Sequence, residues 1–216
     1  MRTLMIVAVL VSGCLGYGGF GTTLLFPDTD GLNRRFTELN RQWSGRGSFD
    51  AAPPLLAVGG HGAGTVGDFT LGGRGAATVA RFQADAVTAE FAGALAFFDA
   101  GYAYAPFDYL VLRPSLELGG MVWAHYVHSR ESFTDPNFSQ WFLATSGGLL
   151  PGVEVMGRLP YGRYRYVGLF VKAGYYLSLY GPEWALDAGP PDFGMQGLTI
   201  HAGLRFGAMP VRPFRI

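Results

Sequence analysis

A short cluster of side chains with catalytic potential lies at residues 125–131. His125, His128, Ser129 and Glu131 all fall within this segment. A serine becomes a nucleophile when a histidine within hydrogen-bond reach takes its proton and a third group orients that histidine. His125 and Ser129 are candidates for such a pair, with Glu131 or Glu117 as the orienting carboxylate. Hydrolysis at this point is therefore one functional hypothesis.

A second set of charged and titratable side chains is spread through otherwise apolar segments. The set comprises Arg74, Glu90, Arg113, Glu117, Glu154, Arg158, Lys172, His201 and Arg205, with His61 as a further candidate. Charges enclosed inside a protein must be paired or hydrated, because an unpaired buried ion is costly. We expect these residues to form a salt-bridge and hydrogen-bond network. The alternative is a narrow polar conduit or a pH-sensitive gate, with His61 or His201 as the titrating group.

The elements that must position these residues are long strands. From Leu110 to Tyr126, every second residue is apolar or small, whereas Arg113 and Glu117 lie on the other face. The same alternation predicts strands over residues 16–26, 54–66, 69–82, 87–104, 109–127, 141–159, 165–180 and 195–207. Several have about 14 to 20 residues, whereas strands of soluble domains usually have about 3 to 10. We assign the apolar face to lipid and the charged face to the interior of a barrel.

In the segment 87–104 this assignment has a specific consequence. Glu90 falls on the face opposite Phe91, Leu95 and Phe97. We therefore expect Glu90 inside the barrel and the three apolar side chains against lipid. Pro114 and Pro151 cannot donate to a strand ladder, so each is expected to mark a bulge.

The connections between the expected strands alternate in length. Short ones are expected at residues 67–68, 105–108 and 160–164, and long ones at 27–53, 129–140 and 181–194. The short connection at 83–86 is the exception. Short periplasmic turns and longer external loops are typical of outer-membrane barrels.

Aromatic residues gather near the ends of these strands, as in the girdles that mark the two membrane interfaces. The expected interfacial residues are Tyr102, Tyr104, Tyr109, Trp123, Tyr126, Trp141, Tyr164 and Tyr166.

The first long connection contains the one helix that the sequence predicts. Leu32, Phe36, Leu39 and Trp43 recur at helical spacing, and Asp28 or Asp30 is a candidate cap. We expect this external, amphipathic helix to cover the barrel rim. A gate, a partner-binding site or a plug in the lumen are the alternatives.

The N-terminus has the composition of an export signal. Met1-Arg2 precedes an apolar run to Val11, which is too short to span a bilayer. We expect a signal peptide over residues 1–15, a barrel over 16–207 and a tail over 208–216. Val11-Ser12-Gly13-Cys14 also resembles a lipobox, so Cys14 is a candidate lipidation site; otherwise it is removed with the signal or packs as a small apolar residue.

Composition argues against several classes of function. The formal net charge is zero, which gives no electrostatic basis for binding nucleic acid. The chain has one cysteine and four scattered histidines, so no metal site is expected. Glycine pairs such as Gly59-Gly60 are not followed by a helix, which argues against a phosphate-binding loop. No cofactor is expected.

The last expected strand runs from Gly197 to Phe206, where a glycine precedes alternating apolar residues and an aromatic ends the strand. Together with the strand pattern, it resembles the small bacterial outer-membrane barrels of the OmpA/OmpX type. The resemblance implies an all-β, closed, antiparallel, up-and-down transmembrane barrel of about eight strands. It also implies recognition by the barrel-insertion machinery and contact with the lipid bilayer, with lipopolysaccharide as a candidate partner. Members of this family usually end at that aromatic, whereas this sequence continues to Ile216. Phe214 or Ile216 is therefore an alternative for the terminal aromatic or apolar residue of the signal.

Three functional hypotheses follow. The first is a non-enzymatic outer-membrane barrel with a structural, surface-binding or narrow-pore role. The second is a lipid A hydrolase, because outer-membrane lipid A deacylases are also small barrels with Ser, His and Glu near the rim; the adjacent His128-Ser129 pair departs from the spacing of those enzymes. The third is a soluble or lipid-anchored binding barrel of the lipocalin type, which requires an apolar interior and a polar exterior.

Overall fold

The computed structural model describes residues 15–43, 45–46, 48–129, 139–161, 165–184 and 194–208. Residues 1–14 of the expected signal segment, including Cys14, and the tail after Ala208 lie outside these residues. The elements are β1 (Leu15–Asp28), α2 (Asp30–Gln42), β2 (Leu55–Val66), β3 (Phe69–Gln83), β4 (Val87–Tyr102), β5 (Tyr104–Phe107), β6 (Leu110–Ser129), β7 (Ser139–Tyr161), β8 (Arg165–Trp184) and β9 (Gly194–Ala208).

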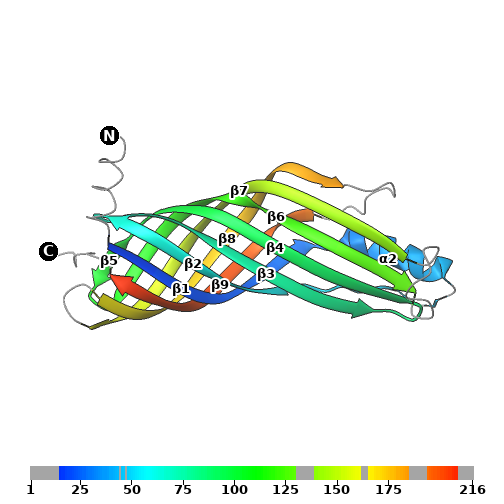
Figure 1. Cartoon of the computed structure of the whole chain (residues 1–216), viewed down its shortest axis with the longest axis horizontal. Coiled ribbons are helices and arrows are strands. Elements are labelled where there is room, and N and C mark those ends of the chain that lie inside the picture. Colours follow the sequence, from blue (N-terminus) through cyan, green and yellow to red (C-terminus); the bar gives the residue numbers. More distant parts are fainter. Residues whose placement is uncertain are drawn as a thin grey trace, which may run out of the picture.

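The strands close into a single barrel (Figure 1). Each long strand pairs antiparallel with its neighbours in the order β4-β3-β2-β1-β9-β8-β7-β6-β5, and a further pairing of β4 with β6 completes the ring. The short β5 pairs with β6 just beyond the end of β4, so β4 and β5 together occupy one strand position of the barrel. The closed, antiparallel, eight-stranded barrel predicted from the sequence is confirmed.

The two ends of the barrel differ. The β2–β3 turn, the start of β1 and the end of β9 lie at one end, and α2 lies at the other (Figure 1). In the tight β2–β3 turn, Gly67 has a φ of 60°, a left-handed conformation that favours glycine. The connection after β3 is also short, with the Ala84 amide donating to the Val87 carbonyl at 2.8 Å.

The prediction of bulges at Pro114 and Pro151 is wrong. The pairing of β6 with β7 passes through both prolines without a shift in register. Pro114 instead lies where β6 changes partner from β4 to β5, so its missing amide falls at a gap in the ladder. The register shifts of β7 against β8 occur between Thr145 and Gly148.

The outer wall of the barrel is apolar. Large hydrophobic side chains point outward from most of the strands, among them Val58, Leu71, Val79, Phe98, Leu118, Val153, Val171 and Leu179. Their neighbours one residue away point into the barrel and are mostly buried, as the alternation of a strand requires.

The inward side chains form layers along the barrel axis, which can be followed along β6. Val111 belongs to an apolar cluster near the short turns. Arg113 and Glu117 follow in a charged layer, and both are fully buried. Met121 and Trp123 then belong to a second apolar cluster, which extends to α2.

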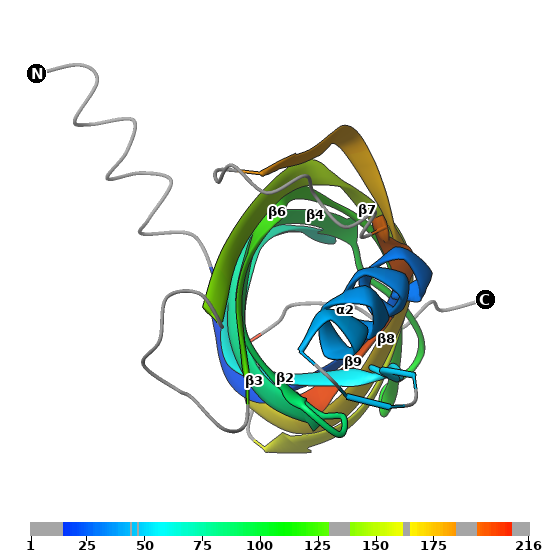
Figure 2. The same cartoon turned by 90° about the vertical axis from the view of Figure 1, so that its right-hand side faces the viewer.

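Helix α2 closes one mouth of the barrel. Figure 2, which looks into this end, shows the helix lying across part of the mouth, on the side of β8 and β9. Leu32, Phe36 and Leu39 are fully buried, and the Phe36 ring lies 6.0 Å from that of Phe91 and 6.3 Å from that of Phe142. The apolar face of the helix is thus directed into the lumen, so the helix covers this mouth of the barrel and its buried side chains plug it.

Polar contacts fix the helix and its flanking loop. The Asn40 side chain accepts from the Ala86 amide at 2.9 Å, beside the β3–β4 turn. The helix begins after Thr29, so the expectation that Asp28 or Asp30 is the N-cap is wrong; Asp28 accepts instead from the amide of Asp30. Trp43 follows the last helical residue and packs against the same apolar cluster.

Candidate functional site: the charged layer inside the barrel

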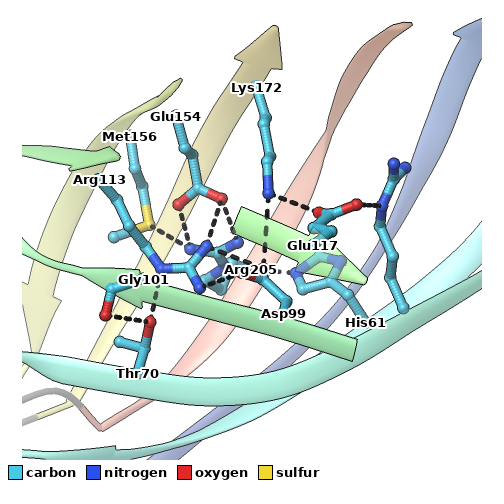
Figure 3. A network of polar contacts seen from close by, with 11 residues as sticks. His61, Thr70, Asp99, Gly101, Arg113, Glu117, Glu154, Met156, Lys172 and Arg205 are labelled. Atoms are coloured by element: carbon cyan, nitrogen blue, oxygen red, sulfur yellow. Dashed lines mark hydrogen bonds and ion pairs between the residues drawn. The ribbon is translucent and has the colours of Figure 1, made fainter. Parts of the chain in front are cut away.

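Within the described part of the chain, seven charged side chains meet in the lumen between the two apolar clusters (Figure 3). They come from six strands around the barrel, because each strand directs every second side chain inward. The cations are Arg74, Arg113, Lys172 and Arg205, and the anions are Asp99, Glu117 and Glu154.

Glu117 joins two of the cations. One carboxylate oxygen accepts from Arg74 Nε at 2.8 Å, and the other accepts from Lys172 Nζ. Lys172 Nζ also lies 3.6 Å from Asp99. Glu117 is fully buried, so both oxygens depend on these partners in place of water.

Arg113 is held by partners on several strands. Its guanidinium donates to both oxygens of Asp99, at 3.0 and 2.8 Å, and its Nε donates to Thr70 Oγ1 at 2.7 Å. Such a bidentate pair fixes geometry as well as charge. A Cβ added to Gly101 would lie 2.8 Å from this guanidinium, so the glycine leaves the space that Arg113 occupies.

Arg205 forms the second bidentate pair, with Glu154. Its two terminal nitrogens each donate to one carboxylate oxygen, and its guanidinium lies over the rings of Tyr17 and Phe170 at 4.2 and 4.6 Å. Arg205 Nε donates to His61 Nε2 at 3.3 Å. The contact between the Arg113 Nη1 and a Glu154 oxygen, at 3.7 Å, links the two bidentate pairs.

His201 lies at the edge of this layer. Its Nδ1 is 3.0 Å from the Thr22 carbonyl and 2.9 Å from Thr23 Oγ1. A carbonyl only accepts, so this contact assigns a proton to Nδ1. Thr23 Oγ1 in turn accepts from Arg74, so the histidine is connected to the ionic network.

The layer fills the lumen. The cavity that remains among these side chains has a volume of about 10 Å³ and is lined by Tyr17, His61, Arg74, Glu154 and other members of the layer. That is about the room one water molecule needs. A hydrated ion is larger, so the arrangement can cross-brace the barrel wall and exclude solute at this level.

The alternation in the sequence places most of these residues together but misses Asp99. Arg74, Arg113, Glu117, Glu154, Lys172, His201 and Arg205 lie in or beside the layer, as does His61. Asp99 has the same parity in β4 as Phe91, Leu95 and Phe97, the face assigned to lipid from the sequence. A carboxylate on that face is the signal that the assignment for β4 is reversed.

The expectation that Glu90 lies in the lumen is wrong. It faces outward and lies 3.8 Å from Arg81, and both side chains are about half exposed. Phe91, Leu95 and Phe97 take the inward positions because this half of the lumen is packed with apolar side chains around α2. Arg158 points inward but lies apart, donating to the Asp108 carbonyl at 2.6 Å beside a turn.

Of the aromatic residues expected at the membrane interfaces, some lie on the outer surface and others inside the barrel. Tyr102, Tyr104, Tyr109 and Trp141 are exposed near strand ends, and the half-buried Tyr126 stacks on Trp141 at 4.4 Å. Trp123 and Tyr166 are buried inside the barrel, at 2% and 1% exposure, so their assignment to an interface is wrong. They fall on the inward parity of β6 and β8. Tyr164 lies outside the described residues.

The structure separates the proposed catalytic pair. β6 stays extended as far as Ser129. At about 3.4 Å per residue, the Cα atoms of His125 and Ser129 are then roughly 14 Å apart, too far for a direct proton transfer. The His125 ring lies 4.4 Å from that of Phe91, in the apolar layer, and His128 Nδ1 lies 2.9 Å from the Ser129 carbonyl. Glu131 lies outside the described residues.

Metal sites and membrane-spanning helices are both absent from the described residues. No group of three or more His, Cys, Asp or Glu side chains there is arranged to hold a metal ion. Within the same residues, no helix is long and apolar enough to cross a membrane.

Comparison with known proteins gives matches among solved structures only. No protein-family profile matches the chain, and no curated protein matches it. Among solved structures, the chain is similar to the crystal structure of Ail, the attachment invasion locus protein of Yersinia pestis. The identity is 11% and the TM-score 0.48, with 90% of this chain and 97% of that chain covered.

Proposed function

We propose that this protein is an integral barrel of the bacterial outer membrane with a closed lumen, and that its role is structural. The observation that carries the proposal is the distribution of polarity. Large apolar side chains cover the outer wall, whereas the charged residues of the middle layer are inside. A barrel in water needs the opposite arrangement, because exposed apolar area is costly. A barrel in lipid needs this one.

The closed lumen supports a structural role over a pore. The charged layer leaves a cavity of about 10 Å³, and α2 fills the mouth above it. Bidentate pairs tie the wall together: Arg113–Asp99 joins the adjacent strands β6 and β4, and Arg205–Glu154 joins β9 and β7 across β8. A narrow pore would require a water-filled path through both layers.

The two other hypotheses receive less support. A lipocalin-like barrel needs a polar exterior, which conflicts with the apolar outer wall. A lipid A hydrolase at His125 and Ser129 needs the two side chains within hydrogen-bond reach, which conflicts with their separation along β6.

Membrane fractionation tests the proposal. The protein is expected to stay with outer membranes through a carbonate wash and to leave them only with detergent. On a gel without prior boiling it should migrate faster than the boiled protein, because a closed barrel resists unfolding. Release by carbonate together with the absence of a mobility shift would contradict an integral barrel.

A further inference from the structure

We infer that the outer wall carries a site for a lipid whose headgroup contains both a phosphate and a primary ammonium; the inference rests on the proposed membrane location. The site is a groove of about 460 Å³ on the outside of β3, β4, β6 and β7. Its volume is within the range of about 300 to 1,000 Å³ that is usual for small-molecule sites. Its outward lining residues are Val79, Arg81, Glu90, Ala92, Ala124, Tyr126 and Trp141.

A row of four side chains forms one edge of the groove. Arg81 pairs in register with Glu90, Glu90 with Tyr126, and Tyr126 with Trp141, so the row crosses four neighbouring strands. It begins near the end of β3 and the start of β4, at the end of the barrel that holds α2. Because aromatic rings mark membrane interfaces, we place this row, with Tyr126 and Trp141, at the level where a lipid headgroup meets the hydrocarbon layer.

The next outward row supplies an apolar floor. Val79, Ala92 and Ala124 are aligned in register directly below the first row. The two alanines are shorter than the tyrosine and tryptophan beside them, which hollows the wall at this point. An acyl chain that lies on this floor would place its headgroup against the charged and aromatic row.

The charges of the row determine which headgroup fits. Arg81 and Glu90 are 3.8 Å apart, and their side chains are 58% and 43% exposed, so both can reach a ligand. A guanidinium binds phosphate, and a carboxylate accepts hydrogen bonds from an ammonium group. The neighbouring rings of Tyr126 and Trp141 favour a cation as well. The site therefore complements a phosphoethanolamine group better than an anionic headgroup, which Glu90 repels, or a choline, which donates no hydrogen bond.

Quenching of Trp141 fluorescence tests the inference. The protein is reconstituted in phosphatidylcholine vesicles that contain brominated phosphatidylethanolamine, phosphatidylglycerol or phosphatidylcholine at equal fractions. Comparison with Trp141→Phe isolates the signal of this residue. We expect an apparent affinity for the ethanolamine lipid about threefold above that for the other two, the size of effect usual for an exposed ion pair.

Charge variants decide the mechanism. Glu90→Gln should remove the preference for phosphatidylethanolamine over phosphatidylglycerol, and Arg81→Gln should weaken quenching by both. Glu38→Gln, at an exposed site on α2, is the matched control and should change nothing. Equal quenching by all three lipids, a preference for the glycerol lipid, or an ethanolamine preference that survives Glu90→Gln would overturn the inference. Heat modifiability of each sample shows separately whether the barrel has inserted, which is the test of the proposed function.

Discussion

Arg205 and Glu154 form a bidentate ion pair across the inside of the barrel, with Arg205 Nη2 donating to a Glu154 oxygen at 2.7 Å. Arg205 lies on β9 and Glu154 on β7, the two strands that flank β8. The pair therefore connects two strands that share no backbone hydrogen bonds. Among the described residues, four cations and three anions occupy the same layer, so the loss of any anion increases the excess of buried positive charge.

Replacement of Glu154 by Gln should destabilise the barrel strongly. The substitution leaves Arg205 and Arg113 without a carboxylate that both now contact. Removal of one partner from a buried pair costs about 3 to 5 kcal/mol. The free energy of unfolding is measured by urea titration in detergent micelles. Glu38→Gln, which breaks an exposed pair on α2, should cost less than about 1 kcal/mol. Equal effects of the two variants would show that the charged layer does not brace the barrel.

An arginine in the middle of the outer wall should impair folding into lipid. Leu118 points outward near the centre of β6, beside Phe98 and Leu149 on the adjoining strands. Leu118→Arg should cost about 2 to 4 kcal/mol, the penalty for a cation near the bilayer midplane. Tyr109→Arg, at an exposed turn position, should cost about 0 to 1 kcal/mol. Folding into vesicles is followed by heat modifiability. If both variants fold as well as the unchanged protein, the wall does not face hydrocarbon.

The plug and the charged layer should close the lumen independently. Phe36→Ala removes a fully buried ring from α2 and should cost about 3 to 5 kcal/mol of stability. In planar bilayers we nevertheless expect neither the unchanged protein nor this variant to conduct, because the charged layer remains filled. Conductance steps in Phe36→Ala alone would identify α2 as the barrier. Steps in both proteins would favour a narrow pore.

A glycine in the β2–β3 turn should be required for its backbone conformation. Gly67 has a φ of 60°, and a Cβ added there meets no atom within 4 Å. Gly67→Val should therefore cost about 1 to 3 kcal/mol through backbone strain alone. Gly157→Ala is the matched control, since a Cβ there also meets nothing but the position has no left-handed φ. It should leave the urea midpoint close to its original value, and a similar loss in both variants would contradict the assignment.

The sequence by itself determined the strands, the tight turns and the apolar face of most strands. These features are local: a strand alternates faces at every residue, and Gly67-Asp68 specifies a turn regardless of what packs around it. The alternation along β6 therefore places Arg113 and Glu117 on one face of the strand without any tertiary contact, and that along β8 places Lys172 on the face opposite Leu169 and Val171.

The tertiary structure alone decided what fills the lumen. Whether Glu90 or Phe91 faces inward depends on α2, whose apolar face enters the mouth from a segment that precedes β4 by more than a whole strand. Asp99 joins the charged layer for the same reason, because it shares the inward face of β4 with Phe97. Period-two alternation separates two faces of a strand but does not say which is inside. Contacts between residues distant in the chain make that choice, as the Phe36–Phe91 contact does here.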